Sequence, residues 1–214
     1  MRHFFIIAIL MCTVNVGAAQ KVAAVSFTNQ YTFIDSMGKV KTSDVNSIEY
    51  NFADAKREVQ LIKFFEKKKA EFNAYQKGIF KYHTMIFDYD STASYSVSNY
   101  NNAKKQLYKR SLIKDNKWQI SNSDVIILGY KTKVATTRDL SGKLYRVYYT
   151  DELTDFKIRY GQYGIPGFVL RYEVERSIFK GRGIDVATAT NIDIYDGTLT
   201  FPNDYQIIEI KGSK

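Results

Sequence analysis

Alternating apolar and polar side chains dominate the chain from residue 79 to residue 210. Successive side chains of a β-strand point to opposite faces, so a two-residue period predicts strands with one buried face. Groups of Gly, Asn, Asp and Ser interrupt the pattern at short intervals and indicate turns. The predicted strands are residues 79–88, 92–98, 106–113, 117–121, 125–138, 143–150, 165–175, 184–195, 198–201 and 205–210.

The first part of the chain follows this pattern less regularly. Residues 23–34 favour a strand, and Ser36-Met37-Gly38 has the composition of a turn. Residues 39–52 have a mixed composition and receive no assignment. Among the later turns, Ser141-Gly142 separates two strands, and Asp196-Gly197 is the strongest hairpin signal, because Asp-Gly tolerates the positive φ values of a type I′ turn.

One segment has a helical composition. Residues 53–77 contain no Gly or Pro and are rich in Ala, Lys, Glu and Gln. Val59 and Ile62 recur at helical spacing, Asp54 suits a first helical turn, and Gly78 suits a helix end. The segment therefore predicts one long helix.

Helical patterns do not alternate with the strands, which argues against a parallel α/β fold. Many short strands favour a curved antiparallel sheet or a partly closed barrel. We therefore expect an α+β, mainly β, fold of about ten short strands with one longer helix at residues 53–77. No internal repeat or low-complexity linker divides the chain, so residues 20–214 form a single predicted β-rich domain.

The stretch from Tyr163 to Leu170 is the only place where a proline stands between glycines inside an apolar run. Proline presets φ at the second position of a β-turn, and glycine accepts the positive φ of a type II turn at the third. We therefore predict a type II turn at residues 165–168, with positive φ at Gly167, followed by a strand from Phe168. The stretch is interpreted as a corner of the fold rather than a binding loop.

Composition changes this picture in two ways. The 17 Tyr and 14 Phe among 214 residues favour a sheet. Residues 1–19 combine a positive start, a short apolar run and the small residues Gly17-Ala18-Ala19, and they predict a secretory signal peptide that is cleaved before Gln20. Cleavage removes Cys12, the only cysteine, so the mature chain is expected to have no disulfide and no thiolate.

The charge points to the class of partner. The net charge of +9 becomes +8 after cleavage, because residues 1–19 contain one arginine and no acid. A basic surface suits nucleic acid, anionic lipid or an acidic partner, or serves solubility alone. Export argues against nucleic acid. The expected location is the periplasm or the periphery of the outer membrane, with the chain soluble after cleavage and membrane-surface contact left open.

Gly164-Ile165-Pro166-Gly167-Phe168-Val169 resembles the hexapeptide that names the GLPGLI family of exported bacterial proteins. Further segments resemble this family's motifs in the same order along the chain. They are Phe87-Asp88-Tyr89-Asp90-Ser91, Trp118-Gln119-Ile120, Gly129-Tyr130 with Ala135-Thr136-Thr137, Tyr148-Tyr149-Thr150, and Phe201-Pro202-Asn203-Asp204-Tyr205.

The resemblance covers about residues 80–210 and makes Gly164, Ile165, Pro166, Gly167, Phe168, Gly129 and Tyr130 the structural signature. It implies an envelope protein of Gram-negative bacteria, of a kind often encoded near TonB-dependent receptors, with no established activity or cofactor. Three features depart from the family pattern. Thr132 stands where the family has a cysteine, and Tyr148 stands where it has a tryptophan. The Gly-Pro that usually precedes the signature is absent, and Arg159-Tyr160-Gly161 stand in that region.

Few residues of the chain are candidates for catalysis or metal binding. His83 is the only histidine after the signal segment, and no G-x-S-x-G motif is present. Asp88 and Asp90 stand two apart and are the candidate paired acids. One histidine and no thiolate leave only oxygen ligands, so we expect no metal and no cofactor. The richest aromatic and basic strand supplies the candidate binding surface: Tyr145, Arg146, Tyr148 and Tyr149.

Three functional hypotheses follow. The first is a non-enzymatic envelope protein that binds either an outer-membrane protein, such as a TonB-dependent receptor, or an apolar, lipid-like ligand on its sheet. The second is an unfamiliar hydrolase that uses Asp88 and Asp90 with His83, provided that their side chains meet in one cleft. The third is a peripheral membrane protein that contacts lipid through the basic helix at residues 53–77.

Overall fold

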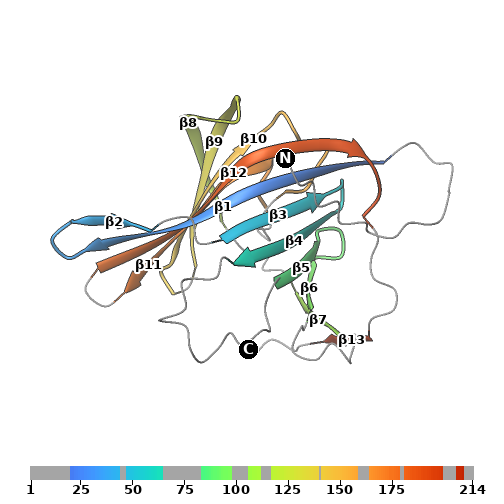
Figure 1. The fold of residues 1–214 in the computed structure, drawn as a ribbon, viewed down its shortest axis with the longest axis horizontal. Helices are drawn as coiled ribbons and strands as arrows, with labels where there is room; N and C mark the ends of the chain where they lie inside the picture. Colours follow the sequence, from blue (N-terminus) through green and yellow to red (C-terminus); the bar gives the residue numbers. More distant parts are fainter. Residues whose placement is uncertain are drawn as a thin grey trace, which may run out of the picture.

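The computed structural model describes residues 20–43, 47–64, 83–97, 106–111, 117–139, 141–158, 164–178, 181–199 and 206–209. Within these ranges the chain forms thirteen strands of one sheet and no helix (Figure 1). The strands are β1 Lys21–Asp35, β2 Val40–Thr42, β3 Ser47–Ala53, β4 Arg57–Phe64, β5 His83–Asp88, β6 Ala93–Val97, β7 Gln106–Ser111, β8 Gln119–Ile127, β9 Tyr130–Arg138, β10 Leu144–Thr150, β11 Phe168–Ile178, β12 Gly181–Asp196 and β13 Gln206–Glu209.

The strand order is β13-β7-β6-β5-β4-β3-β1-β12-β11-β10-β9-β8, and β2 pairs beside this path with β1. The long strands β1 and β12 pair antiparallel from Lys21 with Asp196 to Asp35 with Gly181. All other neighbours are also antiparallel except β13, which runs parallel to β7. The expected antiparallel sheet is therefore a mixed one, and its path does not close into a barrel.

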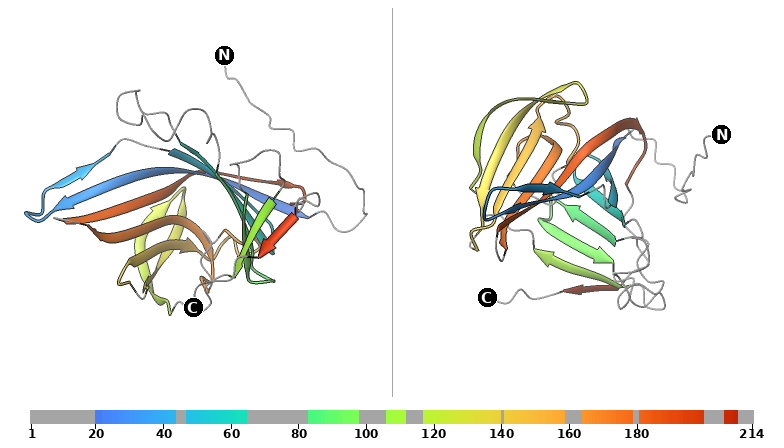
Figure 2. Two further views of the ribbon diagram at one scale, coloured as in Figure 1. Left: turned by 90° about the horizontal axis from the view of Figure 1, so that it is seen from below. Right: turned by 60° about the vertical axis from the view of Figure 1, so that its left-hand side comes forward.

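The sheet is strongly curved, and its two halves bend toward the same side of the central β1–β12 pair (Figure 2). We call the strands β8 to β11 the first wing and the strands β3 to β7 with β13 the second wing. The face toward which both wings bend is the inner face, and the opposite face is the outer face. A strong twist and curvature are the usual shape of a large open sheet.

The main apolar core covers the middle of the inner face. Val25 and Phe27 of β1, Ala187 of β12 and Val147 of β10 are buried there. The chain between β10 and β11 lies against the same core. Its buried side chains are Phe156, Ile158 and Ile165.

This connection, which we call the inner segment (residues 151–158 and 164–167), is fixed by the start of β11. The backbone N–H of Val169 donates to the carbonyl of Ile158 at 2.8 Å. The rings of Phe156 and Phe168 meet edge to face, with centroids 6.5 Å apart. The protein therefore fills the middle of its inner face with its own side chains.

The predicted helix at residues 53–77 is wrong for its first part, and residues 65–77 lie outside the described ranges. Ala53 ends β3, residues 54–56 form a turn, and β4 follows. Glu58 and Gln60 of β4 face inward, whereas Val59 faces outward. The two-residue period was hidden because the buried positions are polar, and pairing with β3 and β5 outweighs helix propensity.

The described chain is thus all-β, not α+β. None of its residues forms a helix that is long and apolar enough to cross a membrane. The membrane-surface hypothesis depended on a helix at residues 53–77, and residues 53–64 do not form one.

Two of the predicted turns are confirmed and share one construction. The carboxylate of Asp35 accepts two backbone N–H groups of the loop between β1 and β2, and Gly38 takes a positive φ of 80°. Asp139 does the same between β9 and β10, where Gly142 also has a φ of 80°. In each case an aspartate organises the loop and a glycine supplies the left-handed residue.

The hairpin predicted at Asp196-Gly197 is wrong. The strand β12 ends at Asp196, and the next described strand, β13, pairs with β7 at the far edge of the sheet. The N–H of Gly197 donates instead to the carbonyl of Gln20 at 2.8 Å, which fastens the end of β12 to the start of β1. Pairing between distant segments therefore determines the course of the chain here, and the local turn preference of Asp196-Gly197 does not.

Candidate functional site

The signature around Pro166 has a structural role. Gly164 takes the positive φ, 86°, that the sequence assigned to Gly167. Ile165 and Phe168 are fully buried in the main core, so the stretch carries the chain from the inner segment into β11. This agrees with the interpretation of the stretch as a corner.

Gly167 is needed for space rather than for a positive φ. A Cβ atom at this position would lie 2.5 Å from the carbonyl oxygen of Thr150 and against the ring of Tyr149. The end of β10 passes so close that no other residue fits without movement. The predicted type II turn with positive φ at Gly167 is therefore wrong, although a side chain at this position would collide with the end of β10.

The second part of the signature forms the hairpin between β8 and β9. Leu128 and Gly129 have φ values of 52° and 85°, as a type I′ turn requires, and Tyr130 begins β9. This turn divides the single strand predicted at residues 125–138. Thr132 is buried and donates its hydroxyl to the carbonyl of Val125 at 2.7 Å.

The candidate binding surface on β10 is split between the two faces. Tyr149 is only 1% exposed in the main core, and this burial raises the pKa of its hydroxyl. Tyr145 is half-buried, and its hydroxyl donates to Asp139 at 3.1 Å. Tyr149 is therefore no surface residue, and only Arg146 and Tyr148 remain together on the outer face.

Arg146 and Tyr148 belong to an outer-face cluster with Arg171 and Glu173 of β11. The buried carboxylate of Glu173 accepts a hydrogen bond from Arg146 at 2.8 Å and forms an ion pair with Arg171 at 2.6 Å. The hydrogen bond to Glu173 raises the pKa of Arg146. The guanidinium of Arg171 also stands 5.5 Å from the centre of the Tyr148 ring. The cluster carries one surplus positive charge, but its charged groups are largely engaged with one another.

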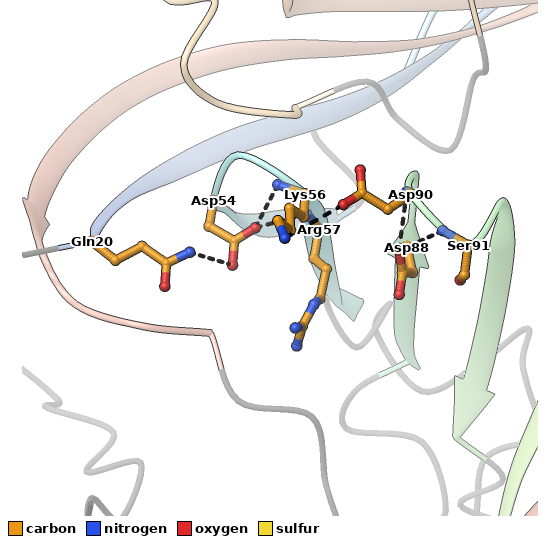
Figure 3. A network of polar contacts seen from close by, with 7 residues as sticks. All are labelled: Gln20, Asp54, Lys56, Arg57, Asp88, Asp90 and Ser91. Atoms are coloured by element: carbon orange, nitrogen blue, oxygen red, sulfur yellow. Dashed lines mark hydrogen bonds and ion pairs between the residues drawn. The ribbon is translucent and has the colours of Figure 1, made fainter. Parts of the chain in front are cut away.

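The structure does not bring His83, Asp88 and Asp90 together. His83 begins β5 and Asp88 ends it, which places their backbones about 17 Å apart. Asp88 accepts the backbone N–H groups of Asp90 and Ser91 at 3.1 and 3.0 Å, and Asp90 pairs with Lys56 at 3.7 Å (Figure 3). These aspartates stabilise the turn after β5, at the opposite end of that strand from the backbone of His83.

Asp54 forms a second network beside this turn. One carboxylate oxygen accepts the backbone N–H groups of Lys56 and Arg57 at 2.8 Å each, and the other faces the amide of Gln20 at 3.4 Å (Figure 3). The carbonyl of Asp54 accepts from the N–H of Lys157. Asp54 thereby joins the start of β1, the β3–β4 turn and the inner segment.

A shallow pocket of about 450 Å³ opens at this junction. It is lined by Gln20, Lys21, Ala55, Thr154, Asp155, Phe156 and Lys157. Two lysines and one aspartate offer mixed charge without a convergent set of ligands. Across the described ranges, no three His, Cys, Asp or Glu side chains gather closely enough to hold a metal ion.

A group of buried, hydrogen-bonded polar side chains was not predicted from the sequence. Glu49 and Asn51 of β3, Glu58 and Gln60 of β4, and Tyr89 form a buried polar ladder on the inner face of the second wing. Asn51 donates to Glu58 at 2.9 Å, Tyr89 donates to Glu58 at 2.6 Å, and Gln60 donates to Glu49. The alternation Glu-x-Asn and Glu-x-Gln was the available signal.

The ladder suits the fixing of strand register. Asn51 and Gln60 stand opposite each other on β3 and β4, and each reaches diagonally to a glutamate of the other strand. A shift of one residue would turn these polar side chains to the other face and remove both bonds. Buried polar networks of this kind specify one arrangement of a core.

The free edge of β8, with its turn, carries four of the nine exposed large apolar residues in the described ranges. This strand ends the sheet order, and its side chains are exposed except at Ser123 and Ile127. Ile120 is 53% exposed and Ile126 is 64% exposed.

Comparison with known proteins gives a fold likeness. No protein-family model and no curated protein matches the chain. Two solved structures of PNGF-II resemble it. The structure in the C2 space group has a TM-score of 0.53 with 18% identity over 90% of this chain, and the one in the P21 space group has a TM-score of 0.54 with 15% identity over 89%. The chain spans about a third of the length of these PNGF-II chains, 31% and 32%, and at this identity the likeness concerns the fold alone.

Proposed function

We propose that this chain is an exported, non-enzymatic binding protein of the bacterial envelope that acts by contact with another protein. The observation that supports protein contact over lipid carriage is the filling of the inner face. Phe156, Ile158 and Ile165 of the chain itself occupy the middle of the curved sheet, where an apolar ligand would otherwise lie.

Three further points support the proposal. Residues 1–19 have the pattern of a signal peptide. The GLPGLI-like motifs imply an envelope protein from the surroundings of outer-membrane receptors. The residues of the hydrolase hypothesis stand at opposite ends of β5, so that hypothesis lacks a common site.

The first test is native mass spectrometry of the full chain expressed with its own leader in a bacterial periplasm and purified without detergent. We expect a polypeptide that begins at Gln20 and carries no adduct. A reproducible lipid-sized adduct would replace the proposal with a carrier function.

The second test identifies the partner protein. The purified chain is cross-linked to detergent-solubilised outer membranes of the source bacterium, and the captured protein is purified and titrated with the chain. Saturable binding with a fixed stoichiometry is expected. Binding of protein-free vesicles with the same strength would contradict a protein partner.

A further inference from the structure

The edge strand β8 leaves one row of backbone groups without a strand partner. In the described part of the chain β8 pairs with β9 alone, because it is the last strand of the sheet order. An unpaired edge presents N–H and C=O groups that another extended chain can bond. The opposite end of the sheet, β13, has only four residues and offers a much shorter edge.

Apolar side chains gather on this edge. Nine large apolar residues are exposed in the described ranges, and four of them lie within nine residues of one another on β8 and its turn. These four are Ile120, Val125, Ile126 and Leu128. Single exposed apolar residues are ordinary, but a cluster on an open edge is typical of an interaction site.

Positive charges flank the apolar residues. Ile126 stands directly opposite the exposed Lys131 of β9, and the exposed Lys117 precedes β8. On the same edge Asp124 is the one described acid. The whole chain is also strongly basic. An incoming strand that alternates apolar and acidic side chains would cover the isoleucines with one of its faces, and its negative charge would suit the basic surroundings of the edge.

A bulge limits how a strand can dock. The register of β8 against β9 shifts between Asn122 and Ile126. Within this bulge the N–H of Val125 bonds the hydroxyl of Ser123 at 3.1 Å, and its carbonyl accepts from Thr132 at 2.7 Å. Bulges of this kind interrupt edge pairing and prevent continuous stacking of strands. The edge therefore fits a short segment in a restricted register.

We propose that the β8 edge is the docking site for an extended segment of a partner protein, in which apolar and acidic side chains alternate. The segment adds a strand beside β8, its backbone bonds the free edge, and its apolar side chains cover Ile120 and Ile126. This proposal rests on the proposed binding function and names the surface and the partner chemistry for it.

The test uses the mature chain and two octapeptides, one of alternating isoleucine and glutamate and one of alternating isoleucine and lysine. We expect the acidic peptide to bind, to slow amide hydrogen exchange at residues 119–127, and to bind more weakly as salt rises. Ile126→Glu should weaken binding about tenfold or more. The matched control is Ile194→Glu, a similarly exposed isoleucine on β12, which should leave binding unchanged.

Four results would overturn the proposal. They are equal binding of the basic peptide, no change of exchange in β8, an equal loss in the Ile194→Glu variant, and a concentration-dependent dimer that Ile126→Glu abolishes, which would make a second copy the occupant. Capture of the outer-membrane partner tests the two proposals separately. If the Ile126→Glu variant still captures the partner, the docking site at the β8 edge is contradicted and the proposed binding function stands. If the chain binds the acidic peptide but captures no membrane protein, the docking site stands and the proposed binding function is contradicted.

Discussion

At the scale of single residues, close approach and buried hydrogen bonds decide which side chains this fold accepts. Gly167 and Glu58 are the clearest cases. Gly167 lies where the chain nearly touches the end of β10, and Glu58 is a fully buried carboxylate that accepts hydrogen bonds from the side chains of Asn51 and Tyr89. Neither position reveals its role through hydrophobicity, so each is tested by substitution.

Gly167→Ala should destabilise the protein by about 1–3 kcal/mol, because the new methyl group would meet the Thr150 carbonyl and the Tyr149 ring. Urea unfolding measures the change. Gly142→Ala is the control, since that glycine has open space and only a positive φ to lose, at a cost of about 1 kcal/mol. A Gly167→Ala variant as stable as the natural protein would show that the end of β10 moves away easily.

Glu58→Leu should cost about 2–4 kcal/mol, because it leaves the amide of Asn51 and the hydroxyl of Tyr89 without this buried acceptor. Glu58→Gln keeps an acceptor oxygen and should cost less. The free energy of unfolding in urea distinguishes the two variants. Equal losses would mean that the charge, and not the hydrogen bonds, matters at this position.

Asp139 should make stability depend on acidity. The hydrogen bond from Ser141, followed by those from Lys143 and Tyr145, lowers the pKa of this carboxyl below the ordinary value of 3.8. Because the folded pKa is the lower one, the stabilisation is complete above pH 3.8 and is lost as the pH falls through the folded pKa. The melting temperature of Asp139→Asn should therefore approach that of the natural protein on acidification below pH 3.8. Melting curves that stay parallel would contradict this assignment.

At the scale of elements, the sequence predicted strands best where turn chemistry and alternation agree. The hairpin of β9 and β10 follows from Ser141-Gly142 and from the regular alternation on both sides. In the second wing, β3 received no assignment and β4 was predicted to be helical, because inner positions at Glu49, Glu58 and Gln60 are polar. Polar burial reverses the usual pattern of a strand, whereas β5 to β7 were predicted as strands.

For the candidate sites, too, local features were predicted from the sequence and features that depend on the whole sheet were not. The strand after the signature at residues 164–168 was placed correctly, because β11 begins at Phe168 and glycine and proline act locally. The surface on β10 was wrong for Tyr149, because alternation alone does not say which face of a sheet is covered by the inner segment. The open edge of β8 was not predicted, since a sequence does not reveal which strand will be last.

The strands should also differ in local stability. We expect amide hydrogens of β13 to exchange fastest and those of β1 and β12 slowest, because β13 has four residues and one parallel neighbour, whereas β1 and β12 are long and central. Hydrogen exchange followed by mass spectrometry gives the ranking. Slow exchange in β13 would mean that the parallel pair is more firmly held than its length suggests.

At the scale of the whole molecule, the order of strands is governed by contacts between distant parts of the chain. The pairing of β13 with β7 and the failure of the Asp196-Gly197 hairpin both result from such contacts. Local patterns identify strands but carry little information about which strands become neighbours. This is why the all-β nature of the second wing and the mixed sheet appeared only in the structure.

The central pair also determines when the protein can fold. Every residue of β1 finds its partner on β12 more than 140 positions later in the chain. A ribosome must therefore release nearly the whole polypeptide before the middle of the sheet exists, and pairings of such long range form slowly. The emerging chain stays open during synthesis. An open chain is the form that a narrow translocation pore can accept, so this strand order would suit the export that we propose.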